Sequence, residues 1–164
     1  MQIEYLKICR FKSIHCLEIE DISQALILVG QNSTGKTTVL DAIRAVGGDY
    51  RIVPEDFDES GANIEITVRL SLCEEDLKRL QKRGKVSSYR RWDSFLADVK
   101  KKLPSFDGET LTFTYIVNRD GRQRFDDGFK KNNPYIRDVF PTIYYIDAER
   151  NPEQFQNDML YLQE

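Results

Sequence analysis

Apolar and polar residues alternate along four stretches of the chain, which is the pattern of strands with one buried and one wet face. These stretches are residues 3–11, 14–19, 64–72 and 110–117. The first two predict a hairpin that turns at Lys12 and Ser13. The fourth leads into Asp120-Gly121, a strong hairpin signal, with a returning strand at residues 123–125. The sequence therefore predicts an antiparallel sheet.

Helical patterns occupy much of the remaining chain. Helices are expected at residues 38–46, 71–83 and 89–103, with a short turn or helix at residues 132–140. Gly47-Gly48 is a stop signal for the first helix. The second begins acidic and ends basic, as the helix dipole favours. Ser87-Ser88 is the expected cap of the third, which Pro104 ends.

A complete phosphate-binding loop, G-Q-N-S-T-G-K-T, runs from Gly30 to Thr37 between an apolar run and the first helix. In this context backbone N–H groups surround the β-phosphate of a nucleotide, Lys36 reaches the β- and γ-phosphates, and the Thr37 hydroxyl holds Mg²⁺. The sequence therefore predicts a nucleoside triphosphate site. Its residues are Gly30, Gln31, Asn32, Ser33, Thr34, Gly35, Lys36, Thr37 and Thr38.

Two apolar runs, residues 25–29 and 142–146, read as strands that are buried on both faces. A complete P-loop nucleotide fold needs a mostly parallel sheet built from several such strands. Two strands do not make that sheet. The expected fold is therefore α/β, a partial P-loop NTPase core of the ABC type with an antiparallel β subdomain and a helical insertion.

Three segments carry a family resemblance. Ile8–Ile14 reads I-x-x-F-K-S-I, Val29–Ile43 reads V-G-Q-N-S-T-G-K-T-T-V-L-D-A-I, and Tyr145–Arg150 reads Y-I-D-A-E-R. Together they resemble the N-terminal lobe of ABC-type ATPases of the SMC/RecF/OLD group. The resemblance is closest to OLD-family (overcoming-lysogenization-defect) endonucleases and related anti-phage ATPases.

This resemblance implies that ATP and Mg²⁺ are the ligands, with Asn32 on phosphate and Arg10 or Lys12 near the nucleotide. It also implies a protein that pairs with its own C-terminal lobe and forms a homodimer through ATP. The nucleotide would then act as a switch in DNA processing, repair or phage defence.

Neither an L-S-G-G-type signature nor a D-E pair after a long apolar strand occurs in the sequence. The whole chain, residues 1–164, is therefore expected to be one lobe of a longer protein. Its parts are a hairpin, P-loop strand and helix at 1–46, antiparallel strands at 47–140 with a basic helical insertion at 74–103, and a buried strand with the start of the next segment at 141–164. Alone, the chain is expected to be nearly inactive.

A rival interpretation rests on Asp147 and Glu149, which follow the apolar residues 143–146 as in a Walker B strand. Asp147 would then bind Mg²⁺, and Glu149 would be the catalytic base of a self-contained small NTPase or kinase. A third class is a module that binds nucleotide without hydrolysing it.

Charge is distributed unevenly along the chain. Residues 78–102 hold ten basic and two acidic residues, +8 in a chain of net charge −3. This segment is either a DNA contact or the solvated face of a helical insertion. Within it, Tyr89 and Trp92 flank Arg90 and Arg91, and these two aromatic residues either stack on bases or belong to the core.

Other chemistry has little support in the sequence. Cys9, Cys16 and Cys73 are spaced without a C-x-x-C pair, which predicts reduced thiols in a cytoplasmic protein and neither a disulfide nor a zinc site. His15 is the single histidine. No apolar run is long enough to cross a membrane.

Overall fold

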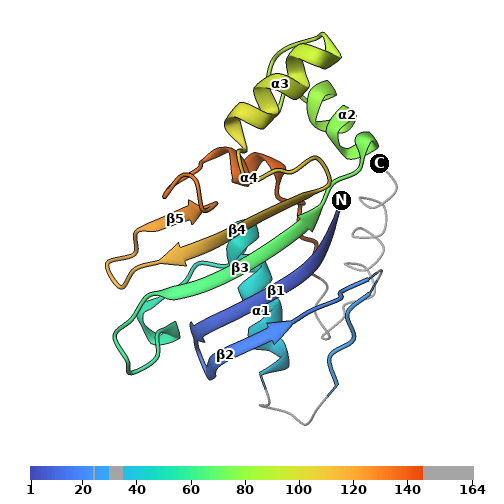
Figure 1. Cartoon of the computed structure of the whole chain (residues 1–164). Helices are drawn as coiled ribbons and strands as arrows, with labels where there is room; N and C mark the ends of the chain where they lie inside the picture. The colour runs from blue at the N-terminus through green and yellow to red at the C-terminus, as the bar shows by residue number, and fades with distance from the viewer. Residues whose placement is uncertain (24, 30–34, 146–164) are drawn as a thin grey trace, which may run out of the picture.

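The computed structural model describes residues 1–23, 25–29 and 35–145, and in this part of the chain five antiparallel strands form one sheet (Figure 1). The strands are β1 (Gln2–Phe11), β2 (Ile14–Ile19), β3 (Ile64–Ser71), β4 (Thr110–Val117) and β5 (Gln123–Asp126), in the order β2-β1-β3-β4-β5. Both predicted hairpins are present, β1–β2 and β4–β5. The prediction of an antiparallel sheet is confirmed.

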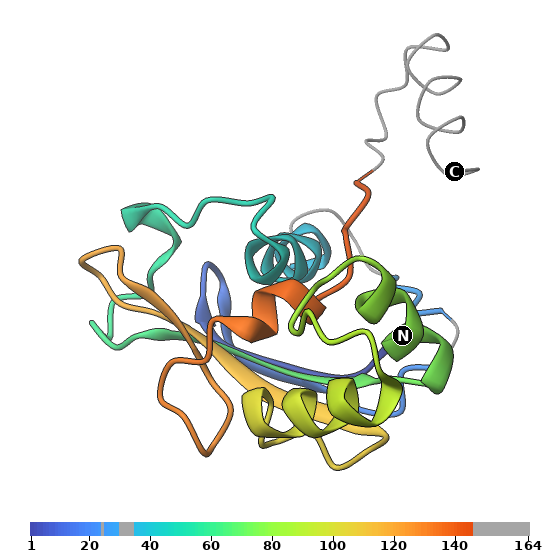
Figure 2. The same cartoon turned by 90° about the horizontal axis from the view of Figure 1, so that it is seen from above.

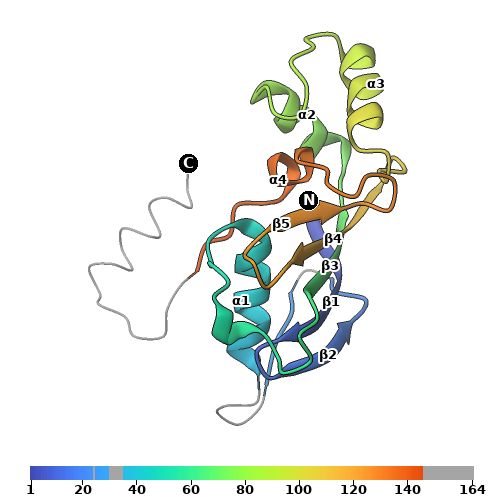
Figure 3. The ribbon, with the colours of Figure 1, turned by 90° about the vertical axis from the view of Figure 1, so that its left-hand side faces the viewer.

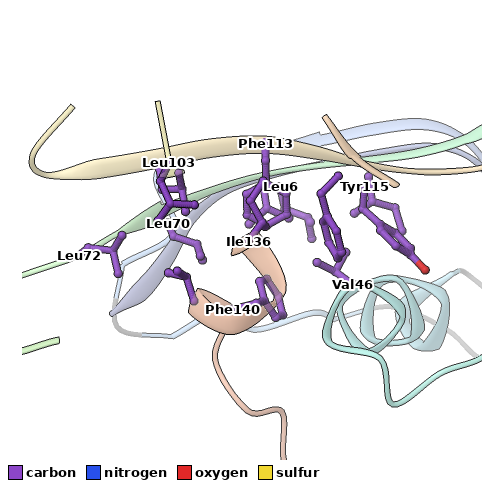
Figure 4. Close-up of a cluster of buried hydrophobic side chains, with 14 of the residues drawn as sticks. Leu6, Val46, Leu70, Leu72, Leu103, Phe113, Tyr115, Ile136 and Phe140 are labelled. Atoms are coloured by element: carbon purple, nitrogen blue, oxygen red, sulfur yellow. The ribbon is translucent and has the colours of Figure 1, made fainter. Parts of the chain in front are cut away.

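The helices lie in two groups. They are α1 (Lys36–Gly47), α2 (Glu74–Lys82), α3 (Trp92–Lys102) and α4 (Tyr135–Val139), with a 3₁₀ turn at Pro54–Asp56. Helices α1 and α4 lie on the same face of the sheet (Figures 2 and 4). Helices α2 and α3 connect β3 to β4, at the opposite end of the molecule from the start of α1 (Figure 3).

One face of the sheet forms the core because its strands alternate as the sequence predicts. Along β3, Ile64, Ile66, Val68 and Leu70 are all fully buried, whereas the residues between them are half-buried and polar. Leu6 of β1, Phe113 of β4, Val46 of α1 and Ile136 of α4 meet in this core (Figure 4). Burial of this apolar face holds α1 against the sheet.

Helix α1 has glycine at both ends. Gly35 precedes it with φ +90° and Gly48 follows it with φ +92°, in the left-handed region that side chains with a Cβ rarely adopt. The Gly48 N–H donates to the carbonyl of Ala45, which closes the helix. The predicted stop at Gly47-Gly48 is confirmed.

Helix α3 begins three residues later than predicted. Ser87 and Ser88 do not cap it, since Arg91 is the residue before its first turn. The Gln81 side chain donates hydrogen bonds to the carbonyls of Tyr89 and Arg90, at 3.3 and 2.9 Å. Because these carbonyls are bound to Gln81, the segment before Trp92 stays out of the helix.

The two runs that were expected to be buried strands are not strands in the described residues. Residues 25–29 form no regular structure, and Ile27 and Val29 are 81% and 90% exposed. Residues 142–145 also lack strand structure, with Tyr144 and Tyr145 exposed, and Ile146 lies outside the described residues. A strand that is buried on both faces needs neighbouring strands, and the described part of the chain pairs none with either run.

The prediction of three reduced thiols is wrong for Cys9 and Cys16. The register of β1 and β2 places these residues directly opposite each other, with their Cα atoms 4.1 Å apart, and their sulfurs form a disulfide. They are seven positions apart in sequence, so only the hairpin brings them together. Cys73 is a free, exposed cysteine. Among the described residues, no helix is long and apolar enough to cross a membrane.

Candidate nucleotide-binding site

The described part of the phosphate-binding loop is its end, where Gly35 passes into α1. The residues from Gly30 to Thr34 lie outside the described residues. Lys36, Thr37 and Thr38 form the first turn of α1, with Thr37 exposed and Thr38 buried. The N-terminus of a helix attracts anions through its dipole and its first N–H groups. This turn is therefore suited to a phosphate group.

The β1–β2 turn lies against the end of the loop. A Cβ atom at Gly35 would lie 3.9 Å from Cγ1 of Ile14 and 4.0 Å from Oγ of Ser13. The structure thus brings the F-K-S segment of the hairpin beside the G-K-T end of the loop, two of the segments that carry the family resemblance.

Arg10 and Lys12, the two basic residues of this turn region, are held in different places. Arg10 donates to the carbonyl of Asn63 and pairs with Glu65, at 2.6 and 2.8 Å. The Lys12 ammonium instead donates to Asp41 of α1 at 2.7 Å. Lys12 is therefore the basic residue that contacts the helix of the loop.

A compact set of charged and aromatic side chains surrounds the Lys12 ammonium. It lies 3.9 Å from a carboxylate oxygen of Asp56 and 4.5 Å from the centre of the Tyr50 ring. Burial lowers the pKa of Lys12, but its bonds to Asp41 and Tyr50 outweigh this effect and hold the pKa above its ordinary value. Lys12 is therefore a firmly protonated cation at neutral pH.

Asp41 joins two cations. Its second carboxylate oxygen accepts a hydrogen bond from Arg44 at 3.1 Å, and only 6% of the residue is exposed. Asp56 is also buried and accepts hydrogen bonds from the Tyr50 hydroxyl and the Val53 N–H. Sequence patterns did not identify Asp41, Tyr50 or Asp56. The signal for Asp41 was a carboxylate one turn after Thr37, among the apolar residues of the helix.

The segment that ends at Tyr145 packs against α1. The backbone of Gly47 is so close that a Cβ there would lie 3.0 Å from Cγ1 of Ile143. Nearer the start of the helix, the Arg44 guanidinium stacks on the Tyr145 ring at 4.2 Å. Ile143 and Tyr145 thus both lie against the last turn of α1. Asp147 and Glu149, the proposed Walker B pair, lie outside the described residues.

The basic segment, residues 78–102, covers α2 and α3, far from the first turn of α1 (Figure 3). Four of its cations, Lys78, Arg79, Lys85 and Lys102, pair with carboxylates. Arg90 and Arg91 are exposed. Trp92 stacks on Phe95 with ring centres 5.7 Å apart, whereas Tyr89 is exposed. No group of three or more metal-binding side chains gathers among the described residues.

The fold has counterparts among solved structures. One, from work on ATP-driven dimerization and DNA-stimulated activation of SMC ATPases, matches with a TM-score of 0.60 at 15% identity, over 99% of both chains. A structure of the SMC head bound to the C-terminal winged-helix domain of ScpA matches with a TM-score of 0.54 at 18% identity. That match covers 85% of this chain and 40% of the other.

These likenesses define a mixed α/β fold with an antiparallel sheet, that of a partial ABC-type ATPase head, and the predicted fold class is confirmed. The AAA domain family matches residues 5–161, so the chain belongs to this family. No curated protein matches the chain in sequence. A special closeness to OLD-family proteins stays a prediction.

Proposed function

We propose that this chain is the N-terminal lobe of an SMC-like ABC-type ATPase and binds Mg-ATP at Gly30–Thr38. The observation that carries the proposal is the position of Gly35, which lies against the hairpin turn and leads into the first turn of α1 at Lys36. Lys36 would bind the β- and γ-phosphates, and the exposed Thr37 hydroxyl would bind Mg²⁺. Lys12 would lie near the nucleotide, on the side of the hairpin turn.

The exposed apolar runs support a second lobe. Ile27 and Val29 are exposed within residues 25–29, and Tyr144 and Tyr145 are exposed on the segment that packs against α1. Apolar runs of this kind mark a surface that another element covers. We infer that a C-terminal lobe supplies the neighbouring strands, so that both runs become central strands of a completed sheet.

ATP would then act as a switch between two such heads. Because the γ-phosphate can contact both members of a homodimer, ATP would hold them together and its hydrolysis would release them. The similar SMC structure concerns ATP-driven dimerization, which supports this assignment by analogy. A role in DNA processing, repair or phage defence rests on the family resemblance.

One observation favours the rival function of a self-contained NTPase. The chain that leads to Asp147 packs against the helix of the phosphate-binding loop, with Ile143 at Gly47 and Tyr145 at Arg44. This course would support Asp147 as a second ligand of Mg²⁺ and Glu149 as the base. Hydrolysis by the chain alone separates this function from the proposed one.

The test of nucleotide binding is Lys36→Ala, measured by titration calorimetry with Mg-ATP. Charge-assisted bonds to phosphate are strong, so we expect affinity to fall at least about tenfold, or roughly 1.4 kcal/mol. Lys100→Ala, which removes an exposed lysine of α3, serves as the control and is expected to bind ATP as the unaltered protein does. Equal affinities for the Lys36→Ala variant and the unaltered protein would show that the assignment of the Mg-ATP site to this loop is wrong.

A further inference from the structure

The β1–β2 turn has an uncommon backbone conformation. Lys12 has φ +51° and Arg10 has φ +61°, both in the left-handed region that residues with a Cβ rarely adopt. Such a conformation persists where surrounding contacts hold it. At Lys12 these contacts are its N–H to the carbonyl of Asp56, at 2.7 Å, and its ammonium to Asp41, also at 2.7 Å.

Asp41 connects this turn to the rest of the candidate site. One carboxylate oxygen binds Lys12, and the other binds Arg44, whose guanidinium stacks on Tyr145. The carboxylate sits one helical turn after Thr37 and is almost fully buried. A single side chain of α1 therefore contacts the hairpin turn directly and, through Arg44, the segment that leads to Tyr145.

The position of the turn matters because Ser13 and Ile14, the next two residues after Lys12, face the end of the loop. A Cβ atom at Gly35 would lie 4.0 Å from Oγ of Ser13 and 3.9 Å from Cγ1 of Ile14, which is ordinary van der Waals contact. The turn thus packs directly against the end of the phosphate-binding loop. A change in the backbone conformation of Lys12 would shift Ser13 and Ile14 relative to Gly35.

We propose that Asp41 is a positioning residue for nucleotide binding: it fixes Lys12, and through it the β1–β2 turn, against the end of the phosphate-binding loop. This inference rests on the proposed function for its consequence in ATP affinity. Its structural part, the holding of the β1–β2 turn against the start of α1 by a buried carboxylate, stands apart from it. Because Asp41 is buried, breaking its ion pair with Lys12 leaves a charge that water cannot compensate, which costs free energy.

The chain offers a matched control. Asp98 and Lys102 of α3 form an ion pair at 2.8 Å, close to the 2.7 Å of Lys12 and Asp41, and both pairs are largely shielded from solvent. Lys102 also donates to the carbonyl of Val86, so this pair too joins a helix to a loop. Asp98→Asn therefore removes a similar interaction far from the candidate site.

The experiment measures two properties of Asp41→Asn and Asp98→Asn in the full chain. The first is amide hydrogen exchange over the segment that joins the turn and the helix: Lys12, whose N–H donates to the carbonyl of Asp56, and residues 35–42, where the Val39 N–H donates to the carbonyl of Gly35. The second is Mg-ATP affinity by calorimetry. We expect Asp41→Asn alone to speed the exchange of this segment and to weaken Mg-ATP binding by about fivefold.

A double-variant cycle then distinguishes positioning from general destabilisation. Lys12→Met removes the ammonium that Asp41, Asp56 and Tyr50 contact and leaves Asp41 paired with Arg44. Asp41→Asn in that background is expected to cause less than about twofold further loss of affinity. Additive losses, unchanged exchange, or equal losses in the Asp98→Asn variant would each overturn the inference. Lys36→Ala is measured in parallel: if it leaves ATP affinity unchanged, the proposed site fails, while the exchange data still decide whether Asp41 orders the turn.

Discussion

Thr37 and Asp41 are neighbours on α1, one turn apart, yet their environments differ sharply. Thr37 is exposed at the start of the helix, whereas Asp41 is buried between Lys12 and Arg44. An exposed hydroxyl at this position is free to bind a metal ion that accompanies the phosphates. The buried carboxylate is already occupied by two cations and is suited to a structural role.

The role of Thr37 can be tested by Thr37→Val, which keeps the shape of the side chain and removes its oxygen. We expect Mg-ATP affinity to fall by roughly tenfold and metal-free ATP affinity to change by less than about twofold, because only the metal loses a ligand. The measurement is calorimetric titration with and without Mg²⁺. An unchanged dependence on magnesium would point to another ligand, with Asp147 as the first candidate.

At the residue scale, sequence patterns identified the phosphate-binding loop but missed the side chains that surround it. A motif of fixed spacing is visible in sequence, and it marked Gly35, Lys36 and Thr37. The contacts of Lys12 with Asp41 and Asp56 join residues 29 and 44 positions apart, which no local pattern reveals. The disulfide of Cys9 and Cys16 was missed because it depends on the exact register of the hairpin.

At the element scale, prediction succeeded where local pattern and burial agree. The strict alternation of β3 and the Asp-Gly turn before β5 gave both strands within a residue or two. It failed for α3, where the distant Gln81 side chain occupies the carbonyls of residues 89 and 90. It failed as well for residues 25–29 and 142–145. Their apolar character predicts strands between two neighbours, and the described part of the chain pairs no strand with either run.

Helices α2 and α3 carry the basic segment, and their role in DNA contact can be tested on Arg90 and Arg91. If these exposed residues follow a phosphate backbone, the double reversal Arg90→Glu/Arg91→Glu in the intact protein should weaken duplex binding by about tenfold or more and flatten its salt dependence, since each neutralised phosphate releases counterions. ATP affinity should stay unchanged, because the segment lies far from α1 (Figure 3).

The control for this reversal is Arg122→Glu/Lys131→Glu, which changes the same amount of charge at exposed positions outside the segment. Binding is measured by fluorescence anisotropy at several salt concentrations. If the Arg90→Glu/Arg91→Glu variant binds duplex as tightly as the unaltered protein, with the same salt slope, these arginines belong to a solvated helix face.

At the scale of the whole molecule, the described fold is an antiparallel sheet with α1 on one face and apolar runs left exposed beside it (Figures 1 and 2). A protein of this size ordinarily buries such runs, and residues as apolar as Ile27 and Val29 cost free energy when they face water. The candidate site shares this incompleteness. One side of the nucleotide would be bound by the loop, the hairpin turn and α1, while a second lobe or a second head would bind the other.

The 164-residue chain alone is therefore expected to bind Mg-ATP yet release phosphate at or near the background rate. Phosphoryl transfer needs a group that orients the attacking water and donors that stabilise the charge on the γ-phosphate, and the chain carries no signature motif to supply the latter. The measurement is phosphate release by the purified chain, compared with the Lys36→Ala variant. Robust turnover that persists in the unaltered chain and disappears in Glu149→Gln would instead establish a self-contained NTPase, with Glu149 as its base and Asp147 on the metal.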